Sequence, residues 1–512
     1  MLFMMVPDRD RFIDLAREGN MIAVSKTILA DFETPVSAYQ KLRGKGESFL
    51  FESVEGGEHL GRYSFVGCHP RAIIRQTEDV VELIEDGITT ERYSVKGALH
   101  TPSGESMRDG LELVEKVMGR FKPVNGGLPS DLRFSGGAVG FIGYEFIHDV
   151  EPVVPRPPQN DLQTPVMYFM IADQLLAFDR VSQTITLIVN ALVEDPADAG
   201  QEYDKACEAI EGLLKSLAQP CQHQPADFHN LSDSAAFESN MPKDTFLKHV
   251  QRSKAYIQAG DIIQVVGSQR FSAPIEASPL DVYRAARSIN PSPYMFLLEL
   301  NGFSLVGASP EIHVRCEDRQ VEIRPIAGTR PRGKDKVQDM THEKDLLADP
   351  KERAEHVMLV DLARNDIGRV CDYQSVEVKD LMIIERYSHV MHIVSQVEGR
   401  LSKEHTPYDL IRATFPAGTL SGAPKIRAMQ IISELEQTAR GPYGGCVGYF
   451  SFNGNLDCCI TIRTALIKDG MAHVQAGGGW VSDSVPEDEF METVNKSKAM
   501  IKAVTLAESW QA

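Results

Sequence analysis

The sequence has no long hydrophobic run and no dense block of basic residues. Its opening stretch, Met1 to Val6, is apolar, but Pro7 and the charged residues after it end this stretch well short of a signal peptide or membrane-spanning helix. Acidic residues outnumber basic ones by 72 to 53, a formal net charge of −19. Such a surface repels phosphate backbones and anionic membranes. We therefore expect a cytoplasmic protein that binds neither nucleic acid nor membranes.

Paired cysteines are also missing. The eight cysteines are scattered without a C-x-x-C spacing, so neither a zinc cage nor a disulfide framework is expected. Residues 444–448 match the G-x-C-x-G elbow of class I glutamine amidotransferases around Cys446. However, Phe450 stands where that elbow has glutamine, and the single later histidine, His473, lacks a glutamate two positions on. We expect Cys446 to lie in a glycine-rich strand and the chain to have no glutaminase of its own.

Length and composition are those of an ordinary globular protein. The 512 residues, 43% of them hydrophobic and 24% charged, are enough for two or three domains. The clearest break is a polar, proline-containing segment. We predict an N-terminal domain over 1–218, a linker over 219–242 and a C-terminal domain over 243–512. Helical and strand-like patterns mix without a βαβ repeat, which favours an α+β fold with antiparallel sheets.

Two predicted helices each carry a Glu-x-x-Glu pair on one face. The residues are Glu352 and Glu355 after a capping Asp349 and Pro350, and Glu489, Glu492 and Lys496 after a capping Ser484 or Asp483 and Pro486. Four carboxylates could thus meet across two helices, and Mg²⁺ prefers such oxygen ligands. The alternative is that these glutamates are solvated and merely favoured by the helix dipole.

A run of three glycines and one arginine suggest sites for anions. Gly477 to Gly479 follow the strand-like run Met471 to Gln475, and their backbone N–H groups could bind a carboxylate. A plain flexible turn is the alternative. Arg463 falls within a predicted strand from Cys458 to Ile467, where its side chain could face a cleft or the solvent.

Several motifs, in order along the chain, resemble those of the chorismate-utilising enzymes. They are Ser309-Pro310-Glu311, residues 325–330 (PIAGTR), 361–366 (DLARND), 389–392 (HVMH), 415–425 (FPAGTLSGAPK), 441–445 (GPYGG) and 476–479 (AGGG). The N-terminal half resembles the large subunit of anthranilate synthase. The resemblance thus covers nearly the whole chain. It implies a two-domain α+β fold in which large antiparallel β-sheets form a sandwich flanked by helices.

The same resemblance implies roles for individual residues. Glu355 and Glu492 match Mg²⁺ ligands, with Glu352 and Glu489 nearby in support. Glu311 matches the acid that protonates the departing 4-hydroxyl of chorismate, and His392 matches a histidine held over the ring. The positions that match the chorismate pocket are Gly328, Thr329, Thr419, Tyr443, Arg463, Gly477, Gly478, Gly479 and Lys496.

Two positions distinguish members of this family. Aminodeoxychorismate synthases carry a nucleophilic lysine where Ala327 stands, and isochorismate and salicylate synthases carry a water-activating lysine where Gln264 stands. Alanine cannot attack the ring, and an amide is not basic enough to activate water. Ammonia needs no such base, so the pair favours anthranilate formation. A non-enzymatic tryptophan sensor is a more distant alternative, but none of the expected catalytic positions is lost.

Regulation and a partner follow from the same resemblance. Leu50 to Ser53 and Asn290 to Phe296 resemble tryptophan-binding segments, which implies an inhibitor site built from Glu52, Ser53, Pro293, Tyr294 and Met295. Phe51 replaces the usual leucine there. Lacking a glutaminase, the chain is expected to receive ammonia from a separate glutamine amidotransferase subunit, in a heterotetramer of two large and two small subunits.

Overall fold

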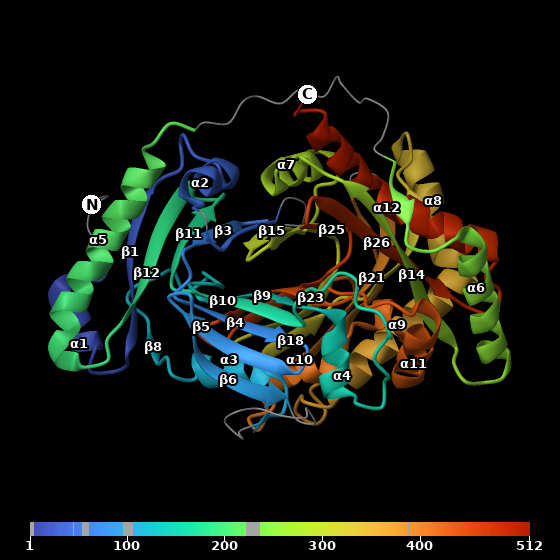
Figure 1. Ribbon diagram of the computed structural model, residues 1–512, viewed down its shortest axis with the longest axis horizontal. Helices are drawn as coiled ribbons and strands as arrows, with labels where there is room; N and C mark the ends of the chain where they lie inside the picture. The colour runs from blue at the N-terminus through green and yellow to red at the C-terminus, as the bar shows by residue number, and fades with distance from the viewer. Residues whose placement is uncertain are drawn as a thin grey trace.

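The structure is a computed structural model that describes residues 5–44, 46–53, 61–95, 106–221, 236–387 and 390–511. Within these ranges the strands form two 13-stranded sheets packed face to face, with helices on their outer sides (Figure 1). The strand pairings are antiparallel apart from two short parallel pairs, β1 with β8 and β6 with β7. This arrangement confirms the predicted α+β sandwich of antiparallel sheets.

The first sheet contains strand β26, which carries the three consecutive glycines. In spatial order it comprises β13 (Glu238–Ser239), β14 (Gln264–Pro274), β26 (Met471–Trp480), β25 (Thr464–Lys468), β16 (Phe303–Ser309), β15 (Tyr294–Leu300), β2 (Ser48–Glu52), β3 (Tyr63–Cys68), β11 (Gln174–Asp179), β12 (Thr184–Leu192), β1 (Met21–Leu29) and β8 (Pro123–Val124), with β22 (Gly422–Ala423) beside β14.

The second sheet contains strand β17, which begins at Ile312, directly after Glu311. It comprises β19 (Ile326–Pro331), β21 (Val390–Arg400), β18 (Gln320–Ile323), β17 (Ile312–Glu317), β24 (Leu456–Ile460), β23 (Cys446–Ser451), β9 (Gly137–Ile142), β10 (Met167–Ala172), β4 (Ala72–Thr77), β5 (Val80–Glu85), β6 (Ile88–Val95) and β7 (Ser106–Met107), with β20 (Glu377–Arg386) beside β21.

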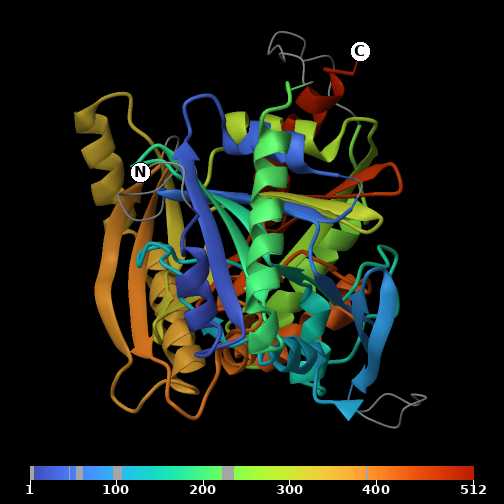
Figure 2. The ribbon, with the colours of Figure 1, turned by 90° about the vertical axis from the view of Figure 1, so that its left-hand side faces the viewer.

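Helices cover the outer faces of the sandwich. They are α1 (Arg9–Leu15), α2 (Pro35–Leu42), α3 (Gly110–Met118), α4 (Ile147–Val150), α5 (Ala199–Leu217), α6 (Lys243–Gln258), α7 (Pro279–Ile289), α8 (Lys336–Ala348), α9 (Pro350–Gly368), α10 (Pro407–Thr414), α11 (Lys425–Glu436) and α12 (Pro486–Glu508), with short 3-10 turns η1 (Tyr144–Phe146), η2 (Pro196–Asp198) and η3 (Gly418–Leu420). Helix α5 crosses over the strands of the first sheet (Figure 2). None of the helices in the described ranges has both the length and the apolar character needed to cross a membrane.

The hydrophobic core lies in layers. Between the sheets, large side chains of both meet, among them Phe49 and Phe296 from the first sheet and Phe141 and Val447 from the second. Further apolar clusters fill the space under the outer helices. Burying this apolar area supplies most of the favourable free energy of folding. Strand β23, which carries Cys446, is buried along its whole length, and so the predicted glycine-rich strand is confirmed.

Both sheets contain strands from either side of the predicted linker. Strand β2 pairs with β15, from Ser48 opposite Glu299 to Glu52 opposite Met295. Strand β9 pairs with β23 in the other sheet. Residues 222–235 of the predicted linker lie outside the described residues. The division at 219–242 stays a prediction, while the hydrogen-bonded sheets run across it.

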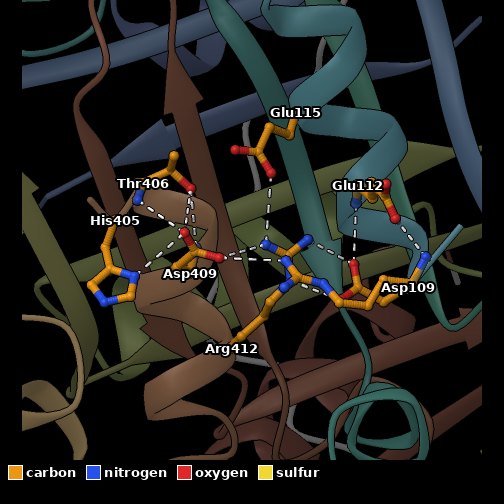
Figure 3. Close-up of polar contacts among 8 residues, drawn as sticks. Asp109, Glu112, Glu115, His405, Thr406, Asp409 and Arg412 are labelled. Carbon is orange, nitrogen blue, oxygen red and sulfur yellow. Dashed lines mark hydrogen bonds and ion pairs between the residues drawn. The ribbon is translucent and has the colours of Figure 1, made fainter. Parts of the chain in front are cut away.

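A buried ion pair also joins the two halves of the chain (Figure 3). Arg412 on α10 donates from Nε and Nη2 to the two carboxylate oxygens of Asp109, at 2.7 and 2.8 Å. Asp109 also caps α3 by accepting the backbone N–H of Glu112. The side chains of Arg412 and Asp109 are only 9% and 2% exposed, so each depends on the other to remain charged in the interior.

Candidate active site

The two helices with Glu-x-x-Glu pairs begin at the predicted prolines. Helix α9 is capped by Asp349, whose carboxylate accepts the backbone N–H groups of Lys351 and Glu352, as predicted. Helix α12 begins at Pro486, but its N-cap is Val485. The prediction of Ser484 or Asp483 as the cap is wrong, because the Ser484 hydroxyl accepts the backbone N–H of Val481 instead.

The three glycines continue strand β26, so the flexible turn is ruled out. Gly477, Gly478 and Gly479 pair with Ser268, Gly267 and Val266 of β14. Their lack of side chains makes room for the site. A Cβ atom on Gly478 would lie 3.2 Å from Oε2 of Glu489 and 3.3 Å from Oε1 of Glu492.

The neighbouring glycines are equally close to other expected site residues. A Cβ atom on Gly479 would lie 2.1 Å from Nε2 of Gln264, and one on Gly477 would lie 2.6 Å from the Tyr443 hydroxyl. Residues from β14, α9 and α12 therefore come together against Gly477 to Gly479 of β26, which we call the glycine strand.

The four glutamates lie close enough to affect one another. Burial raises the pKa of Glu355, and the carboxylates of Glu352 and Glu492 raise it further. Burial likewise raises the pKa of Glu489, with the same effect from Glu492. In the described ranges, no three acidic, histidine or cysteine side chains are gathered tightly enough to coordinate a metal ion. Glu489 Oε2 is nevertheless buried without a hydrogen-bond partner among the described residues, and carboxylates in this position fit a cation.

Arg463 does not lie within a continuous strand. The predicted strand from Cys458 to Ile467 is wrong, because β24 ends at Ile460 and β25 begins at Thr464 in the other sheet. Arg463 occupies the crossing between the sheets with a φ of 51°. Its Nη1 donates to the carbonyl oxygen of Lys496 at 2.6 Å. Burial lowers the pKa of its guanidinium, so Arg463 is a desolvated cation inside the site and not a surface charge.

Lys496 lies on α12 beside the glycine strand. Its Nζ donates to the carbonyl oxygen of Gly477 at 3.1 Å and forms an ion pair with Oε1 of Glu492 at 2.6 Å. The Lys496 ammonium thus lies beside the glycine strand, and the Arg463 guanidinium contacts the backbone of Lys496. This combination suits an anionic ligand.

Glu311 directly precedes strand β17 of the second sheet, and His392 lies on strand β21 of the same sheet. Burial raises the pKa of Glu311 to about 8, although the Thr419 hydroxyl and the Lys496 ammonium act in the opposite direction. Nδ1 of His392 lies 2.8 Å from the carbonyl oxygen of Gly328 and 3.1 Å from Oγ1 of Thr329. Burial lowers the pKa of His392. At neutral pH the site therefore presents a protonated carboxyl and a neutral imidazole.

A buried ion pair behind the site was not found from the sequence. Arg440 donates from Nε and Nη2 to Glu436, at 2.8 and 2.6 Å. It also donates to the carbonyl oxygens of Leu420, at 2.9 Å, and of Val266, at 2.7 Å. Its guanidinium lies over the ring of Tyr443. The only signal in the sequence was the spacing of four between Glu436 and Arg440, which is common on exposed helix surfaces.

A cavity lies between the two sheets, and none of Glu352, Glu355, Glu489 and Glu492 lines it. It has an empty volume of about 730 Å³, open mouth included, and its lining includes Ser53, Pro293, Tyr294 and Met295. Glu52 also contributes to the wall, but its carboxylate accepts the Tyr283 hydroxyl at 2.7 Å under α7. Arg287 forms an ion pair with it there at 2.9 Å.

Comparisons with known proteins identify the family of the chain. The family model for chorismate binding enzymes matches residues 86–502. Anthranilate synthase component 1 of Acetivibrio thermocellus is 44% identical over 508 residues, which covers 98% of this chain and 99% of the relative. The component 1 of Pseudomonas aeruginosa is 46% identical over 506 residues, again 98% and 99% of the two chains.

Solved structures give the same result. The crystal structure of anthranilate synthase component I from Streptococcus pneumoniae superposes with a TM-score of 0.75 at 35% identity, covering 93% of this chain and 99% of that one. The menaquinone-specific isochorismate synthase of Escherichia coli shares the fold, with a TM-score of 0.69 at 16% identity over 97% and 99% of the chains. The chain therefore belongs to the chorismate-binding enzymes, as a member of the anthranilate synthase component 1 family.

Proposed function

We propose that this enzyme converts chorismate and ammonia into anthranilate and pyruvate in a Mg²⁺-dependent reaction. The observation that carries the proposal is the convergence of three elements on the glycine strand. Glu355 from α9, Glu492 and Lys496 from α12 and Gln264 from β14 lie against it. Arg463, at the sheet crossing, joins this group through its hydrogen bond to the Lys496 carbonyl oxygen. The names of the relatives support the product.

The acidic residues fit Mg²⁺. Glu355 and Glu492 would hold the ion, with Glu352 and Glu489 close by, and their mutual repulsion favours a bound cation. When bound, Mg²⁺ neutralises the ring carboxylate of chorismate. A chain with a net charge of −19 would otherwise repel a dianion.

Residues of the chain would hold the rest of the substrate. The Arg463 guanidinium and the Lys496 ammonium would serve as donors, each held in place by a hydrogen bond of its own. Tyr443 lies against Gly477 and adds a hydroxyl. Donors held in place before the substrate arrives need little reorganisation in the transition state.

The acid–base groups fit the expected chemistry. Ammonia would bond to ring carbon 2 while the bond from carbon 4 to its hydroxyl breaks. Hydroxide is a poor leaving group, and Glu311, with its pKa of about 8, is protonated at neutral pH and able to donate. His392, neutral and in contact with the carbonyl oxygen of Gly328, would act in the later loss of pyruvate.

Two residues favour anthranilate over related products. Ala327 on β19 is buried and offers no nucleophile where aminodeoxychorismate synthases have lysine. Gln264 is 4% exposed and acts as a donor toward Glu355, so it is not a base for water. Formation of aminodeoxychorismate is the second candidate function, and product identity separates the two.

We also propose that a glutamine amidotransferase subunit supplies the ammonia. The word component in the names of the relatives supports a partner, and no glutaminase motif was found in the sequence. The expected assembly is a heterotetramer of two large and two small subunits. Sequence composition supports a cytoplasmic location for this complex.

The cavity between the sheets is the proposed site of feedback inhibition by L-tryptophan. Ser53 from β2 and Pro293, Tyr294 and Met295 from β15 would shape a slot for the indole. The carboxylate of Glu52 would bind the ammonium of the ligand, in competition with the Tyr283 and Arg287 partners that hold it under α7.

The test combines purified protein, chorismate, MgCl₂ and ammonium at about pH 8.5, where the uncharged amine is more abundant. We expect anthranilate fluorescence, equimolar pyruvate, and loss of both when Mg²⁺ is chelated. Aminodeoxychorismate or isochorismate as the product would contradict the proposal. Glutamine is expected not to replace ammonium until the partner subunit is added.

A further inference from the structure

A smaller cavity borders Glu311. Its empty volume is about 370 Å³, open solvent at its mouth included, and its lining includes Glu311, His313, Thr419 and apolar side chains of α9 such as Leu359 and Leu362. A water molecule occupies about 30 Å³ in the liquid, so the cavity has room for water. Because it touches the proposed acid, its contents bear directly on the chemistry.

The hydrogen bonds around Thr414 favour one tautomer of His313. The Thr414 hydroxyl donates to the carbonyl oxygen of Leu410 at 2.9 Å. With that proton directed to Leu410, the Nε2 atom of His313, 3.0 Å from the same hydroxyl oxygen, is assigned as the donor of that contact. Burial and the Lys425 ammonium lower the pKa of His313 to about 3, so the ring is neutral. Nδ1 consequently carries a free lone pair.

Two residues that line the cavity carry buried polar atoms with unused hydrogen-bonding capacity. Among the described residues Nδ1 of His313 has no partner, and Oγ1 of Thr419, whose hydroxyl lowers the pKa of Glu311, makes no hydrogen bond within normal distance and angle limits. An unsatisfied buried polar atom costs about 1–3 kcal/mol, and a water molecule with two to four polar neighbours removes this cost. An acceptor, a hydroxyl and a carboxyl around one small cavity provide such neighbours.

We propose that this cavity binds a water molecule between His313, Thr419 and Glu311, and that this water returns a proton to Glu311 after each turnover. His313 is then a positioning residue that acts through the water. The inference rests on the proposed function, because it assumes that Glu311 is the acid.

The protons balance over the reaction. Glu311 gives its proton to the hydroxyl as the bond from carbon 4 breaks, which forms one water and leaves a carboxylate. The new amine at carbon 2 starts as an ammonium and releases one proton to solvent. Glu311 regains one proton through the cavity water. No oxidant or other reactant is needed.

Two substitutions separate this role from simple structural support. The amide of asparagine branches from Cγ, as Nδ1 of histidine does, whereas the amide of glutamine reaches as far as Nε2. His313→Asn keeps the group that holds the water and loses the Thr414 contact, and His313→Gln does the reverse. We expect kcat to fall about tenfold or more in His313→Gln and to stay within about threefold of wild type in His313→Asn, with the KM for chorismate little changed in both. Thermal stability should show the opposite order.

A matched control is His148 on α4. It is also buried, with Nδ1 3.1 Å from the carbonyl oxygen of Val154 and with an unpartnered Nε2 within the described chain, but it does not line this cavity. Neither His148→Asn nor His148→Gln should change kcat. If His313→Asn does not fold, His313→Gln decides the question, because the inference requires its kcat to fall about tenfold or more while the His148→Gln control keeps the wild-type kcat.

The outcomes are distinct. Retained kcat in His313→Gln, or loss of kcat in both folded His313 variants, overturns the water site, because a held water needs only the group that asparagine keeps. If the wild-type protein forms no anthranilate from chorismate and ammonium, the proposed function itself fails and the inference fails with it.

Discussion

Replacing Arg440 by methionine should destabilise the protein far more than losing a surface arginine. The side chains of Arg440 and Glu436 are 1% and 6% exposed. Removing one partner of a buried ion pair leaves an uncompensated charge and costs about 3–5 kcal/mol. Unfolding entropy near 2.1 cal/mol/K per residue makes about 1 kcal/mol equivalent to roughly 1 °C for a chain of this length, so Tm should fall by about 3–5 °C.

The matched control is Arg364→Met. Arg364 pairs with Asp361 at 3.1 Å, but the two side chains are 52% and 59% exposed. An exposed pair contributes about 0–1 kcal/mol, so Tm should fall by less than about 1 °C. Thermal unfolding followed by circular dichroism measures both variants. The double variant Arg440→Met with Glu436→Gln should recover most of the loss, because the unpaired charge is then gone.

The substitution Arg440→Met should also change the activity of the enzyme. Arg440 holds the backbone at Leu420 and Val266, next to Thr419 and to strand β14. Loss of these contacts should raise the KM for chorismate in Arg440→Met even at temperatures where the protein is folded. Equal melting temperatures for Arg440→Met and Arg364→Met would refute the reasoning that the buried pair stabilises the fold.

Three further outcomes are expected. Glu492→Gln should abolish anthranilate formation and weaken Mg²⁺ binding measured by calorimetry, whereas Glu487→Gln, on the exposed face of the same helix, should leave both intact. Ser53→Phe should fill the cavity between the sheets and abolish inhibition by tryptophan while sparing activity; unchanged sensitivity would remove Ser53 from the site. Burial raises the pKa of Glu311 from 4.5 to about 8, so its protonation stabilises the folded state fully below about pH 4.5, and this stabilisation is lost as pH rises through 8. Glu311→Gln should therefore raise Tm relative to wild type more at pH 9 than at pH 6, and an equal difference at both pH values would contradict the burial of this carboxyl.

Local features of the fold could be predicted from the sequence. Asp349 before Pro350 gave the start of α9, because capping depends on neighbouring residues only. Gly260, with a φ of 84°, follows the C-cap of α6, a position where glycine is common because it adopts this conformation without strain. Such signals act over one turn of helix and need no knowledge of distant residues.

Features that depend on strand pairing between distant residues could not be predicted from the sequence. Gly478 lies in a strand because Gly267, more than 200 residues earlier, pairs with it, and three glycines alone suggest a turn. Arg463 lies at a crossing between sheets, which no periodicity in residues 458–467 reveals. The grouping of the glutamates was expected only through the family resemblance, since either Glu-x-x-Glu pair could equally have been solvated.

The sharing of both sheets between distant parts of the chain has a consequence for synthesis on the ribosome. The hydrogen-bonding edges of β2 and β9 are completed only by β15 and β23. At about 5–20 residues per second, those partners are synthesised roughly 12–60 s later. Throughout that interval the nascent chain carries two open strand edges, which are prone to pair with other chains. Expression should therefore depend on chaperones that shield the first half of the polypeptide. A lower growth temperature should increase the yield of soluble protein.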